Sequence, residues 1–324
     1  MIYIIVFLLV NRGSLNLYYS TFYIPRGQHN SFMQYFLIIF LVLATIVVLF
    51  LMVLHIGFRA PRIREIKTPS DFGLAFKEVY IPTFAAKKLY GWLLPVENSN
   101  ETLVILHGWG GNAELMLPIA MPFQKAGVNI LLIDSRGHGK SDAAIVSSLP
   151  RFAEDLGKSI DWLKTEYPER THKIAVLGHS VGAGAVLFET SKRHDIDAVI
   201  SVSAFAHAEW MMTRYLRSFH LPMILVRLIL KYVQWIIGHS FSSFAPLSIV
   251  CEIEAPILIV HGKDDVIIPV EDAHAIIKNC PEPHLELFEV DDAGHESVDK
   301  FEEHADVLIE FLIREGFDIN LSTT

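Results

Sequence analysis

A glycine-flanked serine between an apolar run and a run of small residues constrains this chain more than any other feature. The four apolar residues 174–177 predict a buried strand, and the next five, Gly178–Gly182, read G-x-S-x-G. Small residues from Ala183 onward are typical of a helix that packs closely on the strand. A Cβ at either glycine would clash where strand and helix pass each other. The segment therefore predicts a tight strand-to-helix turn that holds the Ser180 hydroxyl out of the sheet.

Short apolar strands alternate with helical segments along residues 74–316. We expect eight strands, at Phe76–Ile81, Lys88–Leu94, Leu103–Leu106, Asn129–Ile133, Ile174–Leu177, Ala198–Ser203, Ile257–Val260 and Leu285–Val290. Helices are expected at Glu114–Lys125, Phe152–Glu166, Val181–Arg193, Glu271–Lys278 and Val298–Arg314. This alternation predicts an α/β fold with a mostly parallel sheet flanked by helices on both faces.

Residues 205–255 break the alternation and are expected to form a helical cap. The apolar stretch Leu221–Ile237 carries Arg227, Lys231 and Gln234 as one polar stripe. Two interpretations stay open: a cap helix packed over the sheet edge, or an interfacial helix with its basic face toward lipid headgroups.

An uncharged segment near the N-terminus predicts a membrane anchor. The twenty residues from Tyr35 to Leu54 contain no charge, and as a helix they span a hydrocarbon core of roughly 30 Å. We therefore expect a single transmembrane helix at residues 35–57 and a linker at 58–73. Basic residues flank this helix mainly on its C-terminal side, at Arg59, Arg62, Arg64 and Lys67, against Arg12 and Arg26 before it. This asymmetry predicts a cytoplasmic catalytic domain.

The chain ends carry weaker signals. Residues 1–34 are expected to be a separate segment that is either disordered or not translated, because Met33 could serve as the start. Residues 317–324 are expected to form a C-terminal tail.

The charge balance and the cysteines narrow the class of partner. The chain has 36 acidic and 27 basic residues, and an acidic body without a basic patch argues against nucleic acid as a partner. Cys251 and Cys280 lack the spacing of a metal site and neither require nor exclude a disulfide. We expect no metal and no cofactor, and the oligomeric state is left open.

Ser180 needs a base, held in place by an acid, before its hydroxyl can act as a nucleophile. His295 follows the last expected strand, where a loop brings an imidazole over the sheet edge. Asp265 follows the preceding expected strand and begins the pattern D-x-x-I-P, and Asp264 is the alternative acid. The resulting chain order of serine, acid and histidine is one of the known orders of such a triad.

Two backbone N–H groups are expected to stabilise the oxyanion that forms on the substrate. One belongs to Val181, the residue after the serine. The other belongs to Trp109, in the glycine-rich loop Leu106–Asn112 after the third expected strand. His107 in that loop is expected to be structural.

Together these segments resemble the α/β-hydrolase superfamily over residues 74–316. The loop Asp134–Ser141 is similar to the D-x-R-G-H-G-x-S loop of its monoglyceride lipase and serine aminopeptidase branch. The resemblance implies structural roles for Arg136 and His138. The chain departs from that branch at Ala183, where a second glycine is common, and in its cap sequence.

The expected activity is that of a membrane-anchored serine hydrolase, carboxylesterase-like or lipase-like, acting on a small-molecule or lipid ester. Ser180, His295 and Asp265 would form its catalytic triad. A peptidase, thioesterase or acyltransferase using the same triad is the alternative within catalysis. A catalytically idle membrane-anchored binding protein is the alternative outside it.

Overall fold

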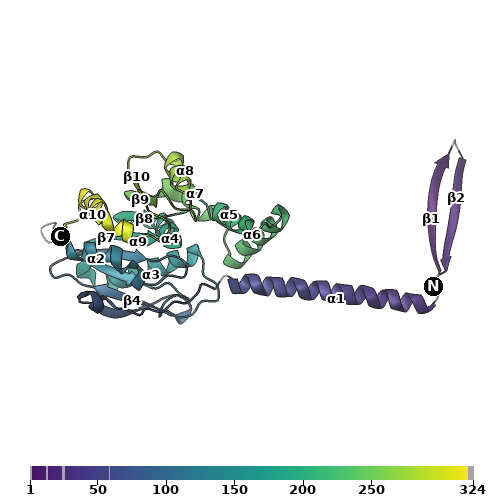
Figure 1. Cartoon of the computed structure of the whole chain (residues 1–324), viewed down its shortest axis with the longest axis horizontal. Helices are drawn as coiled ribbons and strands as arrows, with labels where there is room; N and C mark the ends of the chain where they lie inside the picture. Colours follow the sequence, from purple (N-terminus) through teal and green to yellow (C-terminus); the bar gives the residue numbers. More distant parts are fainter. Residues whose placement is uncertain (1, 12–13, 24–25, 58, 320–324) are drawn as a thin grey trace. The chain divides into compact units, whose positions relative to one another are not determined.

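A computed structural model describes residues 2–11, 14–23, 26–57 and 59–319 (Figure 1). The chain divides into two compact units, residues 1–57 and 58–324. In the first unit, strands β1 (Ile2–Asn11) and β2 (Ser14–Tyr23) pair antiparallel. Helix α1 (Arg26–Gly57) follows them.

Within α1, residues Ser31–Gly57 are long and apolar enough to cross a membrane, and an 18-residue stretch within them has a mean hydropathy of 3.4. The helix begins earlier than the expected residue 35. The described part of residues 1–34 forms the two strands and the start of α1, whereas the expectation was a segment that is either disordered or not translated. That this segment is not translated stays a prediction.

The second unit is built on an eight-stranded sheet, as expected. Its strands are β3 (Lys77–Pro82), β4 (Lys88–Leu94), β5 (Glu101–Leu106), β6 (Asn129–Ile133), β7 (Lys173–His179), β8 (Ala198–Val202), β9 (Ile257–Gly262) and β10 (Leu285–Val290). They lie in the order β10-β9-β8-β7-β5-β6-β4-β3. Only β4 runs against its neighbours, since it pairs antiparallel with β3 and β6. The carboxyl ends of β5 to β10 therefore meet at one edge of the sheet.

Helices cover both faces of this sheet (Figure 1). On one face α2 (Leu117–Lys125), α9 (Val298–Glu303) and α10 (Ala305–Arg314) share a core with alternate strand residues such as Leu103 and Ile105. Val104 points the other way, because successive side chains of a strand face opposite sides. That second face carries α3 (Leu149–Glu166) and α4 (Val181–Thr190), which pack on each other and on β5. Helix α8 (Glu271–Asn279) connects β9 to β10.

The cap lies between β8 and β9 and contains α5 (Ala208–Ser218), α6 (Met223–Ile237) and the short α7 (Pro246–Ile249). Only α6 was expected, because the polar α5 sequence lacks a strong apolar signal. The inner face of α6 is buried through Val226, Ile229, Leu230 and Val233. Its outer face exposes Ile224, Leu228 and Trp235 together with Arg227 and Lys231.

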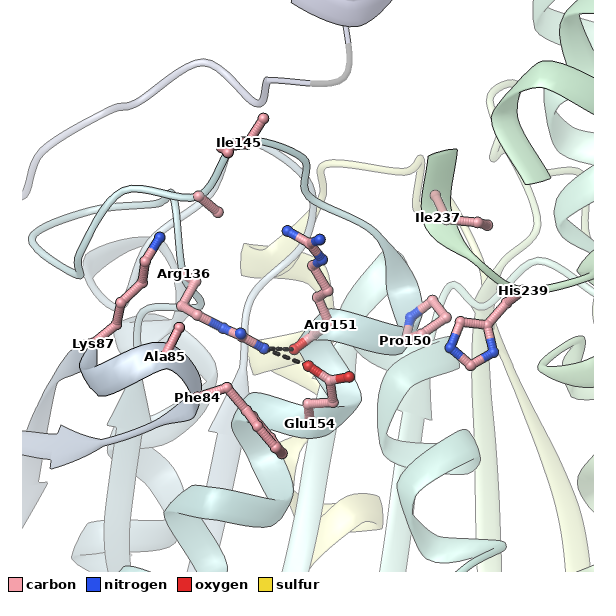
Figure 2. Close-up of a pocket in the computed structure, with 11 residues that line it drawn as sticks. Phe84, Ala85, Lys87, Arg136, Ile145, Pro150, Arg151, Glu154, Ile237 and His239 are labelled. Carbon is pink, nitrogen blue, oxygen red and sulfur yellow. Dashed lines mark hydrogen bonds and ion pairs between the residues drawn. The ribbon is translucent and has the colours of Figure 1, made fainter. Parts of the chain in front are cut away.

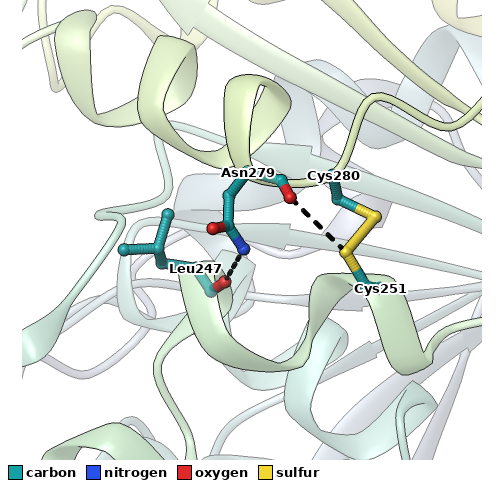
Figure 3. The surroundings of a disulfide bond; sticks show 4 residues. All are labelled: Leu247, Cys251, Asn279 and Cys280. Atoms are coloured by element: carbon teal, nitrogen blue, oxygen red, sulfur yellow. Dashed lines mark hydrogen bonds between the residues drawn. A yellow bond between two sulfur atoms is a disulfide. The ribbon is translucent and has the colours of Figure 1, made fainter.

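A disulfide joins Cys251, in the turn after α7, to Cys280, directly after α8 (Figure 3). Their Cα atoms lie 5.6 Å apart. Beside it, the Asn279 amide donates to the Leu247 carbonyl oxygen over 2.7 Å. The sequence left this pairing open, and the packing of α7 against α8 brings the two cysteines together.

The expected tail at residues 317–324 is described only to residue 319. Phe317 is buried in the core, so the ordered domain extends beyond the expected boundary at residue 316. Residues 320–324 lie outside the described residues.

Candidate active site

Ser180 lies on the expected sharp turn between β7 and α4. Its backbone has φ 56° and ψ −116°, a left-handed conformation that non-glycine residues rarely adopt and that is a source of strain. A Cβ on Gly178 would lie 2.2 Å from the Gly182 carbonyl oxygen, and one on Gly182 would lie 2.5 Å from that of His107. Both glycines are therefore required by backbone contacts, as the sequence pattern indicated.

The structure brings Ser180, His295 and Asp265 together at the carboxyl edge of the sheet. His295 Nε2 lies 2.9 Å from Ser180 Oγ, and His295 Nδ1 lies 2.7 Å from Asp265 Oδ2. Because an ionised carboxylate can only accept a hydrogen bond, the histidine proton is on Nδ1, which donates to Asp265. Nε2 is then unprotonated and can accept the proton of the serine hydroxyl. All three residues are buried, with exposed fractions of 8%, 8% and 4% for Ser180, His295 and Asp265.

Asp265, rather than Asp264, reaches the histidine. Its Oδ1 accepts from the N–H groups of Ile267 and Ile268 at 2.9 and 2.8 Å. Burial by itself would raise the pKa of Asp265, but the hydrogen bonds from His295 and Ile268 outweigh it, and the pKa is lowered. Asp264 is exposed on the turn. Asp265 is thus an ionised acceptor that holds the imidazole.

The glycine-rich loop after β5 forms a turn against the serine. The Gly111 N–H donates to the Gly108 carbonyl oxygen over 3.1 Å. Gly110 has φ +74°, the left-handed third position that a type II turn assigns to glycine. A Cβ on Gly108 would lie 3.1 Å from Ser180 Cβ. Trp109 therefore follows directly on the residue that touches the serine.

Val181 is the first residue of α4. The first N–H groups of an α-helix have no acceptor within the helix, so the Val181 amide is available beside the serine. As oxyanion donors, Val181 and Trp109 stay a prediction.

His107 links two loops of the site. Its Nε2 accepts from the Ser135 N–H over 3.1 Å, so its Nδ1–H donates to the Gly108 carbonyl oxygen over 2.7 Å. Burial and the nearby His138 lower the pKa of His107 to about 3, which keeps the ring neutral. This geometry agrees with the structural role that the sequence suggested.

Arg136 also has a structural role, because its guanidinium forms ion pairs with two residues of α3. Its Nε lies 2.6 Å from Asp155 Oδ1, and its Nη2 lies 2.6 Å from Glu154 Oε2. Figure 2 shows this guanidinium reaching Glu154 at the wall of a cavity of about 330 Å³, which Lys87 and His239 also line. None of Ser180, Asp265 and His295 is among the described residues that line this cavity. Arg136 therefore anchors its loop to α3.

Two buried histidines beside the triad were not anticipated. The His179 Nε2–H donates to the main-chain oxygen of His295 over 2.8 Å, and His261 Nε2 lies 2.8 Å from the Ile268 carbonyl oxygen. Both lie at the ends of buried strands, next to glycines. A polar side chain in such a position was the available signal. Within the described residues, no group of three or more His, Cys, Asp or Glu side chains could hold a metal ion.

Comparison with known proteins supports the fold. Residues 97–248 match the family described as serine aminopeptidase, S33. An uncharacterised membrane protein of Saccharomyces cerevisiae, YNL320W, is 25% identical over 78% of this chain and 85% of its own length. The uncharacterised protein YqkD of Bacillus subtilis is 29% identical over 64% of this chain and 70% of its own.

Among solved structures, the esterase Pf2001 of Pyrococcus furiosus superposes with a TM-score of 0.65 at 27% identity. The match covers 79% of this chain and 97% of the esterase. The α/β hydrolase GrgF of Penicillium, at 23% identity and a TM-score of 0.59, shares the fold over 75% of this chain and 99% of its own. With its sheet order and its matched family segment, the chain belongs to the α/β-hydrolase superfamily.

Proposed function

We propose that this protein is a membrane-anchored serine hydrolase that cleaves an acyl ester, as carboxylesterases and lipases do. The observation that carries the proposal is the series of hydrogen bonds from Ser180 through His295 to Asp265. Ser180 itself lies on a strained turn that presents its hydroxyl to the site. The likeness to the Pyrococcus esterase supports ester substrates. The mechanism needs no metal and no cofactor.

In the first half-reaction the Ser180 Oγ attacks the carbonyl carbon of the ester while His295 Nε2 takes the hydroxyl proton. Asp265 stays ionised and stabilises the imidazolium through the Nδ1–H bond. The carbonyl oxygen becomes an oxyanion, which the N–H groups of Trp109 and Val181 stabilise. Each such donor contributes about 10²–10³ in rate. The imidazolium then protonates the leaving alcohol, and the acyl group stays on Ser180.

In the second half-reaction a water molecule gives its proton to His295 Nε2 and attacks the acyl carbon. The same two amides stabilise the new oxyanion. When it collapses, the carboxylic acid leaves and the proton returns from His295 to Ser180 Oγ. The protein thus ends in its starting protonation state.

Two features favour a lipid ester over a freely soluble one. Helix α1 contains a candidate membrane span, so the anchor would keep the enzyme at a lipid surface. The cap exposes Leu228 and Trp235, 58% and 76% exposed, beside the cations Arg227 and Lys231. A helix face with that composition suits the boundary between headgroups and acyl chains.

The side of the membrane is also part of the proposal. The cations that follow α1 favour a cytoplasmic catalytic domain. The disulfide between Cys251 and Cys280 favours an oxidising compartment instead. Maleimide labelling of Cys251 and Cys280 before and after reduction decides between them.

A peptidase is the second candidate, because the matched family is described as serine aminopeptidase. The triad would attack an amide in the same way, with the amine as leaving group. Matched p-nitrophenyl esters and p-nitroanilides of the same short acyl groups separate the two, since an esterase should turn over the anilides little.

A fluorophosphonate probe tests the core of the proposal on the full chain in detergent. We expect covalent labelling and ester hydrolysis by the wild type, and neither by Ser180→Ala. Ser191→Ala, at the end of α4, is the matched control and should behave like the wild type. Equal labelling of the wild type and Ser180→Ala, or none of either, would overturn the mechanism.

A further inference from the structure

A short strap that follows α1 in the chain packs onto the glycine-rich turn of the candidate site. We define the strap as residues 61–66. A Cβ on Gly110 would lie 2.9 Å from Pro61 Cγ, so Pro61 rests on the left-handed residue of that turn. Asn112 Nδ2 donates to the Ile63 carbonyl oxygen over 3.2 Å. The strap thus touches the turn at its centre and just after its end.

Two more contacts fix the strap to neighbouring loops. The Ile66 N–H donates to Glu114 Oε2 over 2.6 Å. The Arg62 guanidinium donates to the main-chain oxygen of Ser141. A segment expected to be only a linker is therefore bound along its length to the loops after β5 and β6.

Glu65 is the buried residue of the strap. Its side chain is 0% exposed, while Arg64 and Ile66 on either side are exposed. Unless a neighbouring carboxyl is protonated, neither Glu65 carboxylate oxygen has a hydrogen-bond donor among the described residues. An unpartnered buried carboxylate is costly, so this side chain calls for an explanation beyond packing.

The Glu65 carboxylate faces that of Asp134, which follows β6. A Cβ on Gly139 would lie 2.3 Å from Glu65 Oε1 and 2.0 Å from Asp134 Oδ2, so the two oxygens are neighbours. Two buried carboxylates at such a distance cannot both be ionised at low cost, and they share a proton. Burial, and then the Glu65 carboxylate, raise the pKa of Asp134 well above its ordinary value.

The proton therefore belongs on Asp134, whose hydroxyl donates to Glu65. Lys140 balances the remaining charge, with its Nζ 4.0 Å from Glu65 Oε2. Tyr90 lies near Glu65, and its hydroxyl accepts from Lys140 Nζ over 3.2 Å and donates to Glu78. Arg62 of the strap lies near His138. His138 is kept neutral by burial, which lowers its pKa to about 4.

Asp134 connects this pair to the candidate site. Its Oδ1 accepts from the Ala113 N–H over 2.8 Å, at the end of the glycine-rich loop. Its Oδ2 accepts from the Lys140 N–H over 2.9 Å, in the loop after β6. A displacement of the Asp134 carboxyl would therefore move both loops, and with them the turn that presents the Trp109 amide.

We propose that the strap positions the oxyanion turn, with Glu65 as a positioning residue that acts through Asp134. The inference rests on the proposed function, because the Trp109 amide matters only if Ser180 reacts. It implies that the segment adjoining the membrane anchor takes part in setting the turnover rate.

The shared proton gives the arrangement a pH dependence. When the pH rises enough to remove that proton, two buried carboxylates face each other and repel. The strap then leaves its position, and turnover falls on the alkaline side. A glutamine at position 65 is uncharged, and its amide N–H can donate to the Asp134 carboxylate once that group is ionised, so the substitution should abolish this alkaline fall.

The test uses the full chain in detergent and p-nitrophenyl butyrate, with the spontaneous hydrolysis subtracted. Glu65→Ala should lower kcat by about tenfold or more, because misplaced catalytic groups cost rate, while KM stays within about twofold. Glu65→Gln should restore most of kcat at neutral pH and lose the alkaline fall. Glu166→Gln, an exposed carboxylate at the end of α3, should match the wild type throughout.

Two results would overturn the inference: a kcat for Glu65→Ala equal to that of Glu166→Gln, or an alkaline fall in Glu65→Gln like that of the wild type. If Glu65→Ala does not fold, the pH profile of Glu65→Gln decides alone. Failure of the proposed function looks different, since Ser180→Ala would then retain the activity of the wild type.

Discussion

The Nε2–H of His179 donates to the main-chain oxygen of His295 over 2.8 Å, so the residue before Ser180 holds the loop that carries the candidate base. Burial and the neighbouring His295 lower the pKa of His179 to about 4. The ring is therefore neutral near pH 7, with its proton on Nε2. This bond joins the serine turn to the histidine loop independently of the triad itself.

Replacing His179 should consequently misplace His295 without removing any triad member. We expect His179→Ala to lower kcat by about 10- to 100-fold, because a shift near 1 Å in a catalytic group has costs of that order. The exposed His172→Ala is the control. A kcat for His179→Ala within twofold of this control would argue against the positioning role.

The two adjacent aspartates provide an internal comparison. Asp265→Asn replaces the carboxylate that accepts from His295 Nδ1–H, which favours the wrong tautomer, and in such triads this costs about 10⁴ in kcat. Asp264→Asn changes an exposed carboxylate one position away and should leave kcat unchanged. Steady-state hydrolysis of a soluble ester measures both. A large loss of kcat in Asp264→Asn instead would mean that Asp264 is the acid of the triad.

The sequence was most informative where local backbone geometry dictates residue type. A Cβ on Gly178 or on Gly182 would lie less than 3 Å from main-chain atoms. Both positions therefore require glycine, and the sequence motif predicts the turn. The strands β4, β6 and β10 have the expected bounds because each is a short run rich in apolar residues, with polar or turn-forming residues near each end.

The features that could not be predicted from the sequence depend on contacts between segments that are distant in the chain. Glu65 lies in a stretch whose composition is that of a basic linker, and only the fold brings it against Asp134. The expected helix Val298–Arg314 is divided at His304 into α9 and α10. The pairing of Cys251 with Cys280 likewise depends on how α7 meets α8.

The burial of Asp155, the partner of Arg136, makes stability depend on pH. Burial raises the pKa of Asp155 from 3.8 to about 6, although Arg136 opposes this shift. The folded state thus keeps a proton that the unfolded state has released between these pH values. The contribution of Asp155 to the free energy of unfolding is greatest below pH 3.8, falls as the pH rises to about 6, and is then constant.

Asp155→Asn removes that titration. Relative to this variant, the wild type should lose about 2 kcal/mol of unfolding free energy between pH 4 and pH 6. Denaturant unfolding at several pH values measures the difference. Glu154→Gln changes the half-exposed partner of the same arginine and keeps Asp155, so the wild type should show no such loss relative to Glu154→Gln. A pH-independent difference between the wild type and Asp155→Asn would contradict the assignment.

The outer face of α6 should matter for substrates presented in a membrane. Lys231→Glu reverses one exposed charge of that face, and a cation near an anionic surface contributes about 1 kcal/mol. We expect weaker hydrolysis of an ester in anionic vesicles, with hydrolysis of a soluble ester unchanged. Arg227→Glu with Lys231→Glu should enlarge the effect. Lys278→Glu, which changes an exposed lysine of α8, is the matched control. An equal loss of vesicle hydrolysis in Lys278→Glu would contradict a contact between the cap and lipid.

The Cys251–Cys280 disulfide predicts on which side of the membrane the catalytic domain lies. Disulfides persist in oxidising compartments and are rare where thiols are kept reduced, whereas the cations after α1 predict the cytoplasmic side. If the disulfide forms in the cell, both cysteines should resist a maleimide reagent under denaturing conditions until a reductant is added. Cys251→Ser frees Cys280 and is the positive control, since one thiol should then react directly. Because closing a loop of this length stabilises by about 3.6 kcal/mol, the oxidised wild type should also unfold at higher denaturant concentration than Cys251→Ser. Immediate labelling of both cysteines in the wild type would instead favour the cytoplasmic side that the charges predict.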